Sequence, residues 1–328
     1  MSGKVRVGRA LSLVGVNVLV LIALLCLAEA ALRVLGIPYA GDYVPTEDAI
    51  ARFDKDLGWA YIPGLSKEIP FGTRIRTVHF DDEGIRVSAA DTRLFKTRPS
   101  VLFVGCSVTM GHGLSYEESF VGQFGLLAGD SWQVVNLGVQ GYGTDQSLLA
   151  LKKFAPGFNT KVVVYTFIGD HNYRNGSYDR RRLIPSIKVV GTKPQFALDP
   201  AGVPYLAKKP LPLADYRISY LRELVTMRWE DRIGSGPAYP VNLTLALIRE
   251  MATYCRERNI RFVVVNWRWS DAEVDWLRDL GVDVIDTLKD APAGWENMTI
   301  PGDTHPDVSA GTYVARILYD YFRDRSLL

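Results

Sequence analysis

The sequence has few of the residues that would indicate a disulfide-bonded or metal-binding protein. Its three cysteines, Cys26, Cys106 and Cys255, lie far apart, and no group of potential ligand residues has the spacing of a metal site. This pattern excludes a disulfide framework and gives no reason to expect a metal centre. We expect no metal ion and no other cofactor.

The chain also lacks an excess of charge of either sign. Its 38 Lys and Arg residues face 36 Asp and Glu residues, a formal net charge of +2 at pH 7. Electrostatics therefore gives no reason to expect a nucleic acid as a partner. Apolar residues make up 48% of the chain, which is ordinary for a globular protein with a core. The 328 residues suffice for one large domain or two small ones.

One long uncharged run lies near the N-terminus, at Ala10–Ala28. As a helix it would span roughly 28 Å, close to the thickness of the hydrocarbon core of a membrane. Basic residues precede it, which predicts a cytoplasmic N-terminus and an exported remainder. A cleaved signal peptide is the alternative, because Ala28-Glu29-Ala30 has the form of a cleavage site. We expect an uncleaved anchor, with the rest of the chain periplasmic or extracellular.

The remainder divides into an arm and a domain. Residues 1–36 form the cytoplasmic tip and the transmembrane anchor, 37–99 an irregular arm packed on the core, and 100–328 the main domain. In that domain, apolar runs typical of buried strands alternate with helical segments. The expected strands are Val101–Val104, Gln133–Asn136, Lys161–Ile168, Ile260–Asn266 and Val282–Ile285. This alternation predicts an α/β fold with a parallel sheet covered on both faces.

Between about residues 176 and 240 the alternation stops. This segment has many prolines and a run Arg180-Arg181-Arg182, and we expect the turn of a hairpin at 199–203. We interpret it as an insertion over the carboxyl edge of the sheet, where open α/β sheets bind ligands. The three arginines are typical of a solvated surface, and a site for an anionic substrate is the alternative.

A candidate nucleophile follows the first strand of the domain. Val101–Val104 leads to Gly105, Cys106 and Ser107. A serine hydroxyl needs a base to take its proton before it can attack a carbonyl. Ser107 could instead cap a helix, a common use of serine after a strand. Cys106 should point away from Ser107, because neighbours on an extended backbone face opposite ways, and we expect it to be buried and inert.

The required base and its partner stand together near the C-terminus, in Asp303-Thr304-His305. His305 would accept the Ser107 proton and later return it to the leaving alcohol, while Asp303 would orient the imidazole. Asp303 could alternatively cap the helix expected from Val308, but Asp307 is better placed for that. With this pair in the sequence, the nucleophile interpretation of Ser107 is favoured.

Four segments together resemble the SGNH (GDSL-type) hydrolase superfamily, in a membrane-anchored bacterial form. They are Gly105-Cys106-Ser107-Val108-Thr109, the loop at Gly138, the turn after Ile168 and Asp303-Thr304-His305, spread over residues 100–325. The resemblance implies a three-layer α/β/α, flavodoxin-like domain with Ser107 as nucleophile. Two features depart from the family: Cys106 replaces an aspartate, and Asp303 stands two residues before His305 instead of three. A similar Asp-x-His form occurs in related polysaccharide O-acetyltransferases.

The resemblance also implies an oxyanion hole, formed by the backbone N–H groups of Ser107 and Gly138 and by an asparagine after the third strand. An ungapped comparison places Asp170 at that third position, where an ionised carboxylate would be a poor donor. Asn172 or His171 could serve if the loop is longer, and we favour Asn172. Asn172 could alternatively satisfy only backbone groups of its loop.

From this resemblance we expect a serine esterase that forms an acyl-Ser107 intermediate on an extracytoplasmic ester, either a small molecule or an acylated glycan. One alternative is an O-acyltransferase that modifies a cell-envelope polysaccharide. The other is a non-catalytic glycan-binding or assembly protein that retains the fold.

Overall fold

The computed structural model describes residues 2–39, 50–71, 74–91, 93–183, 189–233, 241–267 and 271–328. The centre of the sheet consists of five parallel strands, β6 (Pro99–Gly105), β7 (Gln133–Gly138), β8 (Asn159–Phe167), β11 (Arg261–Asn266) and β12 (Asp283–Asp286). Their order is β12-β11-β8-β6-β7. β6, β8 and β11 are buried beyond their first residues, as expected for strands covered on both faces. The predicted α/β class is confirmed.

The segment before residue 99 is more regular than predicted. Three of its strands, β3 (Ser66–Phe71), β4 (Arg74–Phe80) and β5 (Arg86–Val87), extend the main sheet beyond β7 in antiparallel fashion. Two more, β1 (Ala51–Asp54) and β2 (Gly58–Tyr61), pair as a separate hairpin. The sheet is therefore mixed, because the edge of β7 is closed by strands of the arm. Positions 40–49, 72–73 and 92 of this arm lie outside the described residues.

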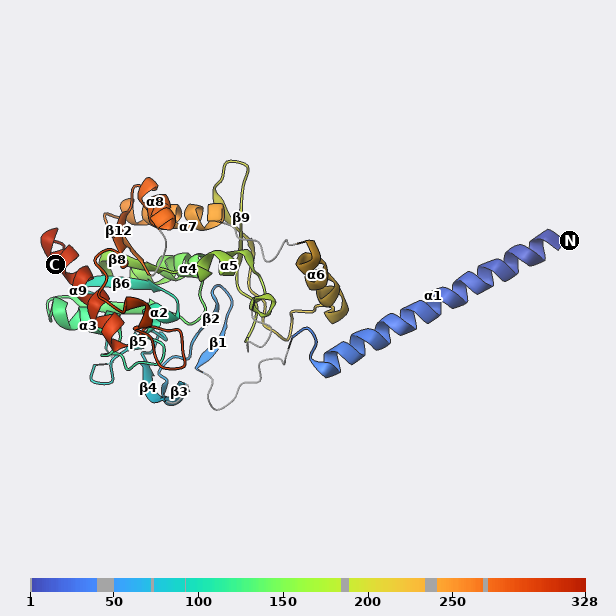
Figure 1. Ribbon diagram of the computed structural model, residues 1–328, viewed down its shortest axis with the longest axis horizontal. Coiled ribbons are helices and arrows are strands. Elements are labelled where there is room, and N and C mark those ends of the chain that lie inside the picture. The colour runs from blue at the N-terminus through green and yellow to red at the C-terminus, as the bar shows by residue number, and fades with distance from the viewer. Residues whose placement is uncertain are drawn as a thin grey trace.

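Helices cover both faces of the sheet, which confirms the three-layer architecture (Figure 1). One face is covered by α4 (Thr144–Phe154), α7 (Val241–Arg256) and α8 (Asp271–Asp279), and the other by α3 (Phe120–Ala128) and α9 (Val308–Asp324). Side chains such as Leu247 and Met251 fill the first layer, and Phe124 and Leu318 the second, all fully buried. Each contributes about 1.5–3 kcal/mol by leaving water.

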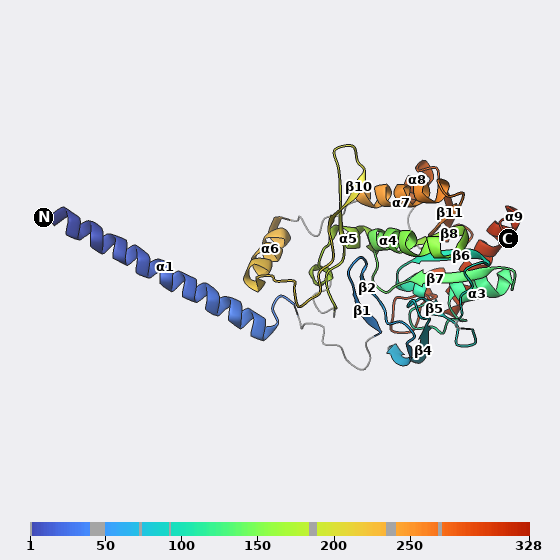
Figure 2. The same ribbon diagram turned by 180° about the vertical axis from the view of Figure 1, so that it is seen from behind.

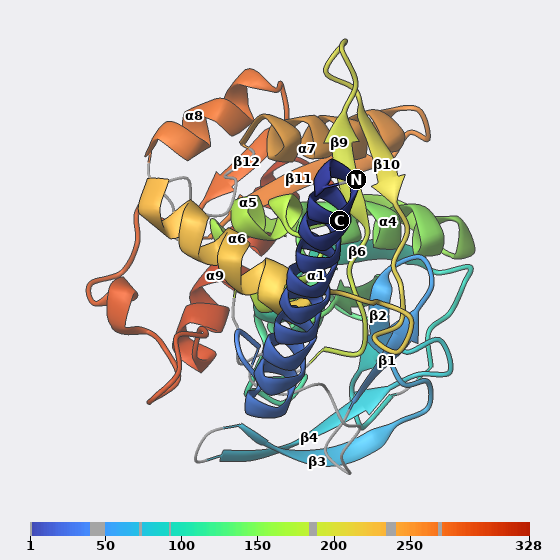
Figure 3. The same ribbon diagram turned by 90° about the vertical axis from the view of Figure 1, so that its right-hand side faces the viewer.

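A single long helix, α1 (Ser2–Leu35), projects away from the domain (Figures 1 and 2). Leu19 and Leu27 on it are more than 60% exposed. Its part Leu13–Leu35 is long and apolar enough to cross a membrane, a property that it shares with signal sequences. The carboxylate of Glu29 near its end accepts hydrogen bonds from the N–H groups of Tyr220 and Leu221 (3.0 and 2.9 Å). It thereby caps α6 (Tyr220–Ile233), which lies beside the base of α1 (Figure 3).

The helix α5 (Asp170–Gly176) ends where the predicted insertion begins. The described part of the insertion contains three elements. They are a short 3-10 turn at Arg180–Arg182, the hairpin of β9 (Gln195–Leu198) and β10 (Pro204–Lys208), and α6. The hairpin projects from the domain (Figure 3). Residues 184–188 and 234–240 of the insertion lie outside the described residues.

Candidate active site

The turn after β6 exposes one of its two nucleophilic side chains and buries the other. Gly105 has φ 155°, and a Cβ there would overlap the Thr109 side chain, so the turn requires glycine. Cys106 is extended and Ser107 opens the short helix α2 (Ser107–Met110). Cys106 is 0% exposed and Ser107 is 7% exposed. The serine hydroxyl is therefore the group that faces the candidate site.

Ser107, His305 and Asp303 form one continuous chain of hydrogen bonds. His305 Nε2 lies 2.8 Å from Ser107 Oγ, and His305 Nδ1 lies 2.6 Å from Asp303 Oδ1. Asp303 Oδ1 also accepts from the backbone N–H of His305 (2.9 Å), which fixes the turn between the two residues. The α9 helix is capped by Asp307, which accepts from the Ala310 N–H, so Asp303 is not its cap.

The charges and hydrogen bonds around Asp303 and His305 indicate which of their atoms carry protons. Burial alone would raise the pKa of Asp303, but the hydrogen bonds from His305 outweigh it and lower that pKa. An ionised carboxylate only accepts hydrogen bonds, so the Nδ1 atom of His305 carries the proton. Nε2 is then free to accept the proton of Ser107, which is the tautomer that a general base needs.

A second histidine, His112, contacts the same carboxylate. Its Nε2 atom lies 3.4 Å from Asp303 Oδ2, and its ring stacks on His305 with centroids 4.1 Å apart. Gln140 Nε2 donates to its Nδ1 atom (2.5 Å), which leaves the proton on Nε2. Burial and the charge of His305 lower the pKa of His112 to about 4. No sequence pattern singles out His112, because it reaches Asp303 only through the fold.

The predicted oxyanion donors are less well placed. The N–H of Gly138 donates to Asn136 Oδ1 (3.0 Å), and the same Asn136 side chain donates to Thr109 O (3.0 Å). A Cβ at Gly138 would overlap the backbone of Thr109 and Met110, so glycine is required there by close approach. A substrate oxyanion that used the Gly138 N–H would have to replace Asn136 Oδ1 there, and the role of Gly138 as an oxyanion donor stays a prediction. The N–H of Ser107, at the first position of its helix, has no carbonyl four residues earlier in the helix to pair with.

The turn after β8 holds the three residues considered for the third oxyanion donor, Asp170, His171 and Asn172. Asn172 lies in α5, 1% exposed, and both atoms of its amide are buried without a hydrogen-bond partner among the described residues. His171 is fully buried and its Nδ1 atom bonds to Tyr165 Oη (2.6 Å). Burial lowers the pKa of His171 well below its usual value. The Asp170 side chain is largely exposed and pairs with Arg174 (3.2 Å).

His112, Asp303 and His305 also bring three potential metal-ligand atoms within 4.8 Å of one another. In the described arrangement these side chains are committed to one another and to Ser107 by hydrogen bonds and ring stacking. Neutral imidazoles and a carboxylate are suitable zinc ligands in general. The absence of a metal stays a prediction.

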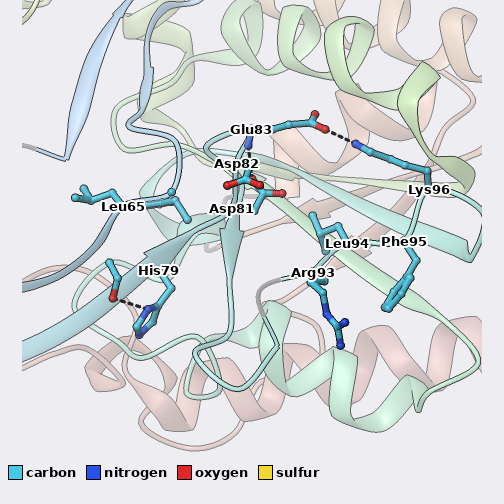
Figure 4. A pocket seen from close by; sticks show the side chains of 12 residues that line it. Leu65, His79, Asp81, Asp82, Glu83, Arg93, Leu94, Phe95 and Lys96 are labelled. Atoms are coloured by element: carbon cyan, nitrogen blue, oxygen red, sulfur yellow. Dashed lines mark hydrogen bonds and ion pairs between the residues drawn. The ribbon is translucent and has the colours of Figure 1, made fainter.

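A cavity of about 540 Å³ lies elsewhere, between β3–β4 and the segment Arg93–Lys96 (Figure 4). Glu83 pairs with Lys96 at its rim (2.5 Å), and Ser66 bonds to His79 (2.8 Å). Asp81 accepts from N–H groups of its own turn. These polar groups hold the loops together, and Ser107 does not line this cavity.

No family model and no curated protein sequence matches the chain. Solved structures similar to it include the psychrotrophic esterase EstA from Pseudoalteromonas sp., with 10% identity and a TM-score of 0.40 over 69% of this chain and 97% of that one. A carbohydrate acetylesterase family member from Sinorhizobium meliloti has 11% identity and a TM-score of 0.39, over 69% of this chain and 98% of that one. The lipase/acylhydrolase from Enterococcus faecalis has 12% identity and a TM-score of 0.39, over 69% of this chain and 96% of that one. Similarities this low carry no information about the activity of this chain.

Proposed function

We propose that this protein is a serine ester hydrolase of the SGNH type, which acts through an acyl-Ser107 intermediate. The observation that supports it is the pair of short contacts of His305, 2.8 Å to Ser107 Oγ and 2.6 Å to Asp303 Oδ1. A nucleophile, a base and an orienting carboxylate in this order are the parts of nucleophilic acyl transfer.

In the first half of the reaction, Ser107 Oγ attacks the ester carbonyl as its proton moves to His305 Nε2. The carboxylate of Asp303 stabilises the imidazolium, and the N–H of Ser107 and the amide of Asn172 donate to the oxyanion. The tetrahedral intermediate then collapses, and the alcohol leaves with the proton of His305.

In the second half, His305 takes a proton from the acceptor, which attacks the acyl group and frees Ser107. Water as acceptor makes the protein an esterase, and a sugar hydroxyl would make it an O-acyltransferase. We favour water, and an acylated glycan outside the cytoplasmic membrane is the substrate that the location below suggests.

The location is part of the same proposal. The apolar part of α1 would cross the membrane, with the basic residues Lys4, Arg6 and Arg9 on the cytoplasmic side and the domain outside. A reporter that is active only in the cytoplasm, fused after Leu328, should be silent. An active reporter would contradict this orientation without affecting the chemistry at Ser107.

The chemistry is tested with para-nitrophenyl acetate and the full chain in detergent. We expect release of one equivalent of nitrophenol in a rapid phase, and a Ser107 peptide that gains one acetyl group. Ser107→Ala should abolish both, and Cys106→Ala, its neighbour, should retain them. A folded wild-type protein without turnover or acetyl-serine would contradict ester hydrolysis and favour the non-catalytic, glycan-binding alternative.

A further inference from the structure

The three consecutive arginines of the 3-10 turn have three different environments. Arg181 is buried and forms an ion pair with Asp179 (2.8 Å). Arg182 forms an ion pair with Glu223 (3.4 Å). The Arg180 side chain has no hydrogen bond and no ion pair with any residue that the structure describes, although its backbone carbonyl accepts from the Leu183 N–H (3.0 Å). The run is therefore neither a uniformly solvated surface nor a uniform cationic patch.

Arg180 lies against the active-site loops. Its guanidinium stacks over the Trp59 ring, 5.5 Å from the centroid, and a Cβ at Gly141 would overlap its Nη1 atom. Trp59 Nε1 donates to Gln140 O (2.9 Å), so ring and loop are held together. The loop of Gly141 follows Gly138, the last residue of β7. The guanidinium thus borders the predicted oxyanion loop.

The Arg180 guanidinium stays charged in this desolvated position. Burial and the neighbouring Arg174 lower the pKa of Arg180 to about 9, and Asp170 acts in the opposite direction. A pKa of about 9 leaves the guanidinium charged at neutral pH.

The local charges do not balance. Three cations, Arg174, Arg180 and Lys193, lie close enough to influence one another. Arg174 pairs with Asp170 (3.2 Å), and Lys193 pairs with Asp145 in a fully buried contact. Three cations minus two carboxylates leave one positive charge, that of Arg180. A desolvated charge is costly unless it is paired, so this position favours an anion supplied from outside the described residues.

We propose that Arg180 binds a carboxylate of the substrate, and that the protein therefore prefers esters that carry a carboxylic acid in their acyl or alcohol part. The proposal rests on ester hydrolysis at Ser107. A planar guanidinium matches a carboxylate through two parallel hydrogen bonds. One uncompensated charge suits a monoanion, whereas a phosphate dianion would require more. The Trp59 ring packs against this guanidinium.

The test uses two matched pairs of esters with the full chain in detergent. The first pair is mono-para-nitrophenyl succinate and its methyl ester, which differ in a carboxylate of the acyl half. The second is an O-acetylated glucuronic acid and its methyl ester, which differ in the alcohol half. Turnover is measured with the wild type. Binding is measured by calorimetry with Ser107→Ala, which cannot form an acyl-enzyme.

We expect at least one pair to favour the acid by about tenfold or more, in kcat/KM and in affinity. Arg180→Gln should bring the ratio of acid to methyl ester near one, and Arg180→Lys should retain part of it. Arg182→Gln, the matched control in the same turn, should keep the ratio. If Arg180→Gln does not fold, the wild-type ratios and Arg180→Lys decide.

Ratios near one for both pairs, or a preference that survives Arg180→Gln, would overturn the carboxylate site. The two proposals fail separately. Loss of turnover with preserved preference in the binding experiment contradicts ester hydrolysis alone. Turnover without any preference contradicts the role of Arg180 alone.

Discussion

The two sides of the candidate active site differ in how completely their polar atoms are paired. On one side, Ser107, His305 and Asp303 form an unbroken chain of short hydrogen bonds, which we call the relay. On the oxyanion side, the Gly138 N–H is bonded to a neighbouring side chain, and the amide of Asn172 has no partner among the described residues. An unpaired buried amide costs about 1–3 kcal/mol.

This difference indicates which side is complete before the substrate arrives. The relay is held by contacts within the protein, so its geometry does not depend on a ligand. In the proposed mechanism, the amide of Asn172 would find its partner in the ligand, and the Gly138 N–H could donate only if the ligand replaced Asn136. Unpaired buried polar groups are rare in proteins and are commonly found where function requires them.

The largest effect is expected from removing the negative charge of the relay. Asp303→Asn keeps the shape but lets His305 adopt the wrong tautomer, so kcat should fall about ten-thousand-fold. Turnover of para-nitrophenyl acetate and the thermal midpoint are measured together. Asp307→Asn is the control, because asparagine also caps a helix. A loss below tenfold for Asp303→Asn would mean that the relay is not used.

The second effect separates two asparagines of α5. Asn172→Ala should lower kcat about 100- to 1000-fold, the usual cost of an oxyanion donor, without loss of stability. Asn175 instead donates to Thr144 and Thr244 (3.0 and 2.8 Å). Asn175→Ala should therefore cost about 1–3 kcal/mol in stability. Equal rates for wild type and Asn172→Ala would remove Asn172 from the oxyanion hole.

The third effect is a loss of stability in acid. The pKa of His112 is about 4 when folded and about 6.5 when unfolded, so the unfolded chain binds the proton first. The contribution of His112 is therefore complete above about pH 6.5 and is lost as the pH falls toward 4. Between neutral pH and about pH 4.5 the loss is about 2 kcal/mol. In denaturant unfolding, the stability of His112→Asn should fall by about 2 kcal/mol less than that of the wild type over this pH range. An equal fall in both proteins would contradict the lowered pKa of His112.

The smallest effect concerns the contact between His112 and Asp303. His112→Phe keeps a ring against His305 but removes the N–H that faces the carboxylate. Because that contact is long, at 3.4 Å, we expect kcat to fall only about five- to tenfold. Turnover of para-nitrophenyl acetate measures the effect, and a kcat equal to that of the wild type would make His112 a packing residue.

The relay and the central strands could be predicted from the sequence because their signals are local. Apolar runs mark β6, β8 and β11, and Asp303 and His305 are two residues apart. The position of His112 could not be predicted, since it depends on how α2 packs beside a distant turn. The bond from Gly138 to Asn136 spans only two residues, so an asparagine two positions before a glycine was an available signal.

The structure of the arm and of the run Arg180–Arg182 could not be predicted from the sequence, because it depends on contacts between distant segments. Strands β3 to β5 pair with β7 through contacts across the fold, which a pattern of residues within the arm does not reveal. The run Arg180–Arg182 is uniform in sequence, but each side chain points to its own neighbours. Charge compensation is a property of those neighbours and not of the run.

Mapping the adduct of a fluorophosphonate probe on the full-length protein tests the central claim most directly. The activated hydroxyl of Ser107 should be labelled in wild type and in Cys106→Ala, and the adduct should be absent in Ser107→Ala and strongly slowed in His305→Ala. Folded wild-type protein without an adduct, or an adduct that persists in Ser107→Ala, would contradict the proposed nucleophile.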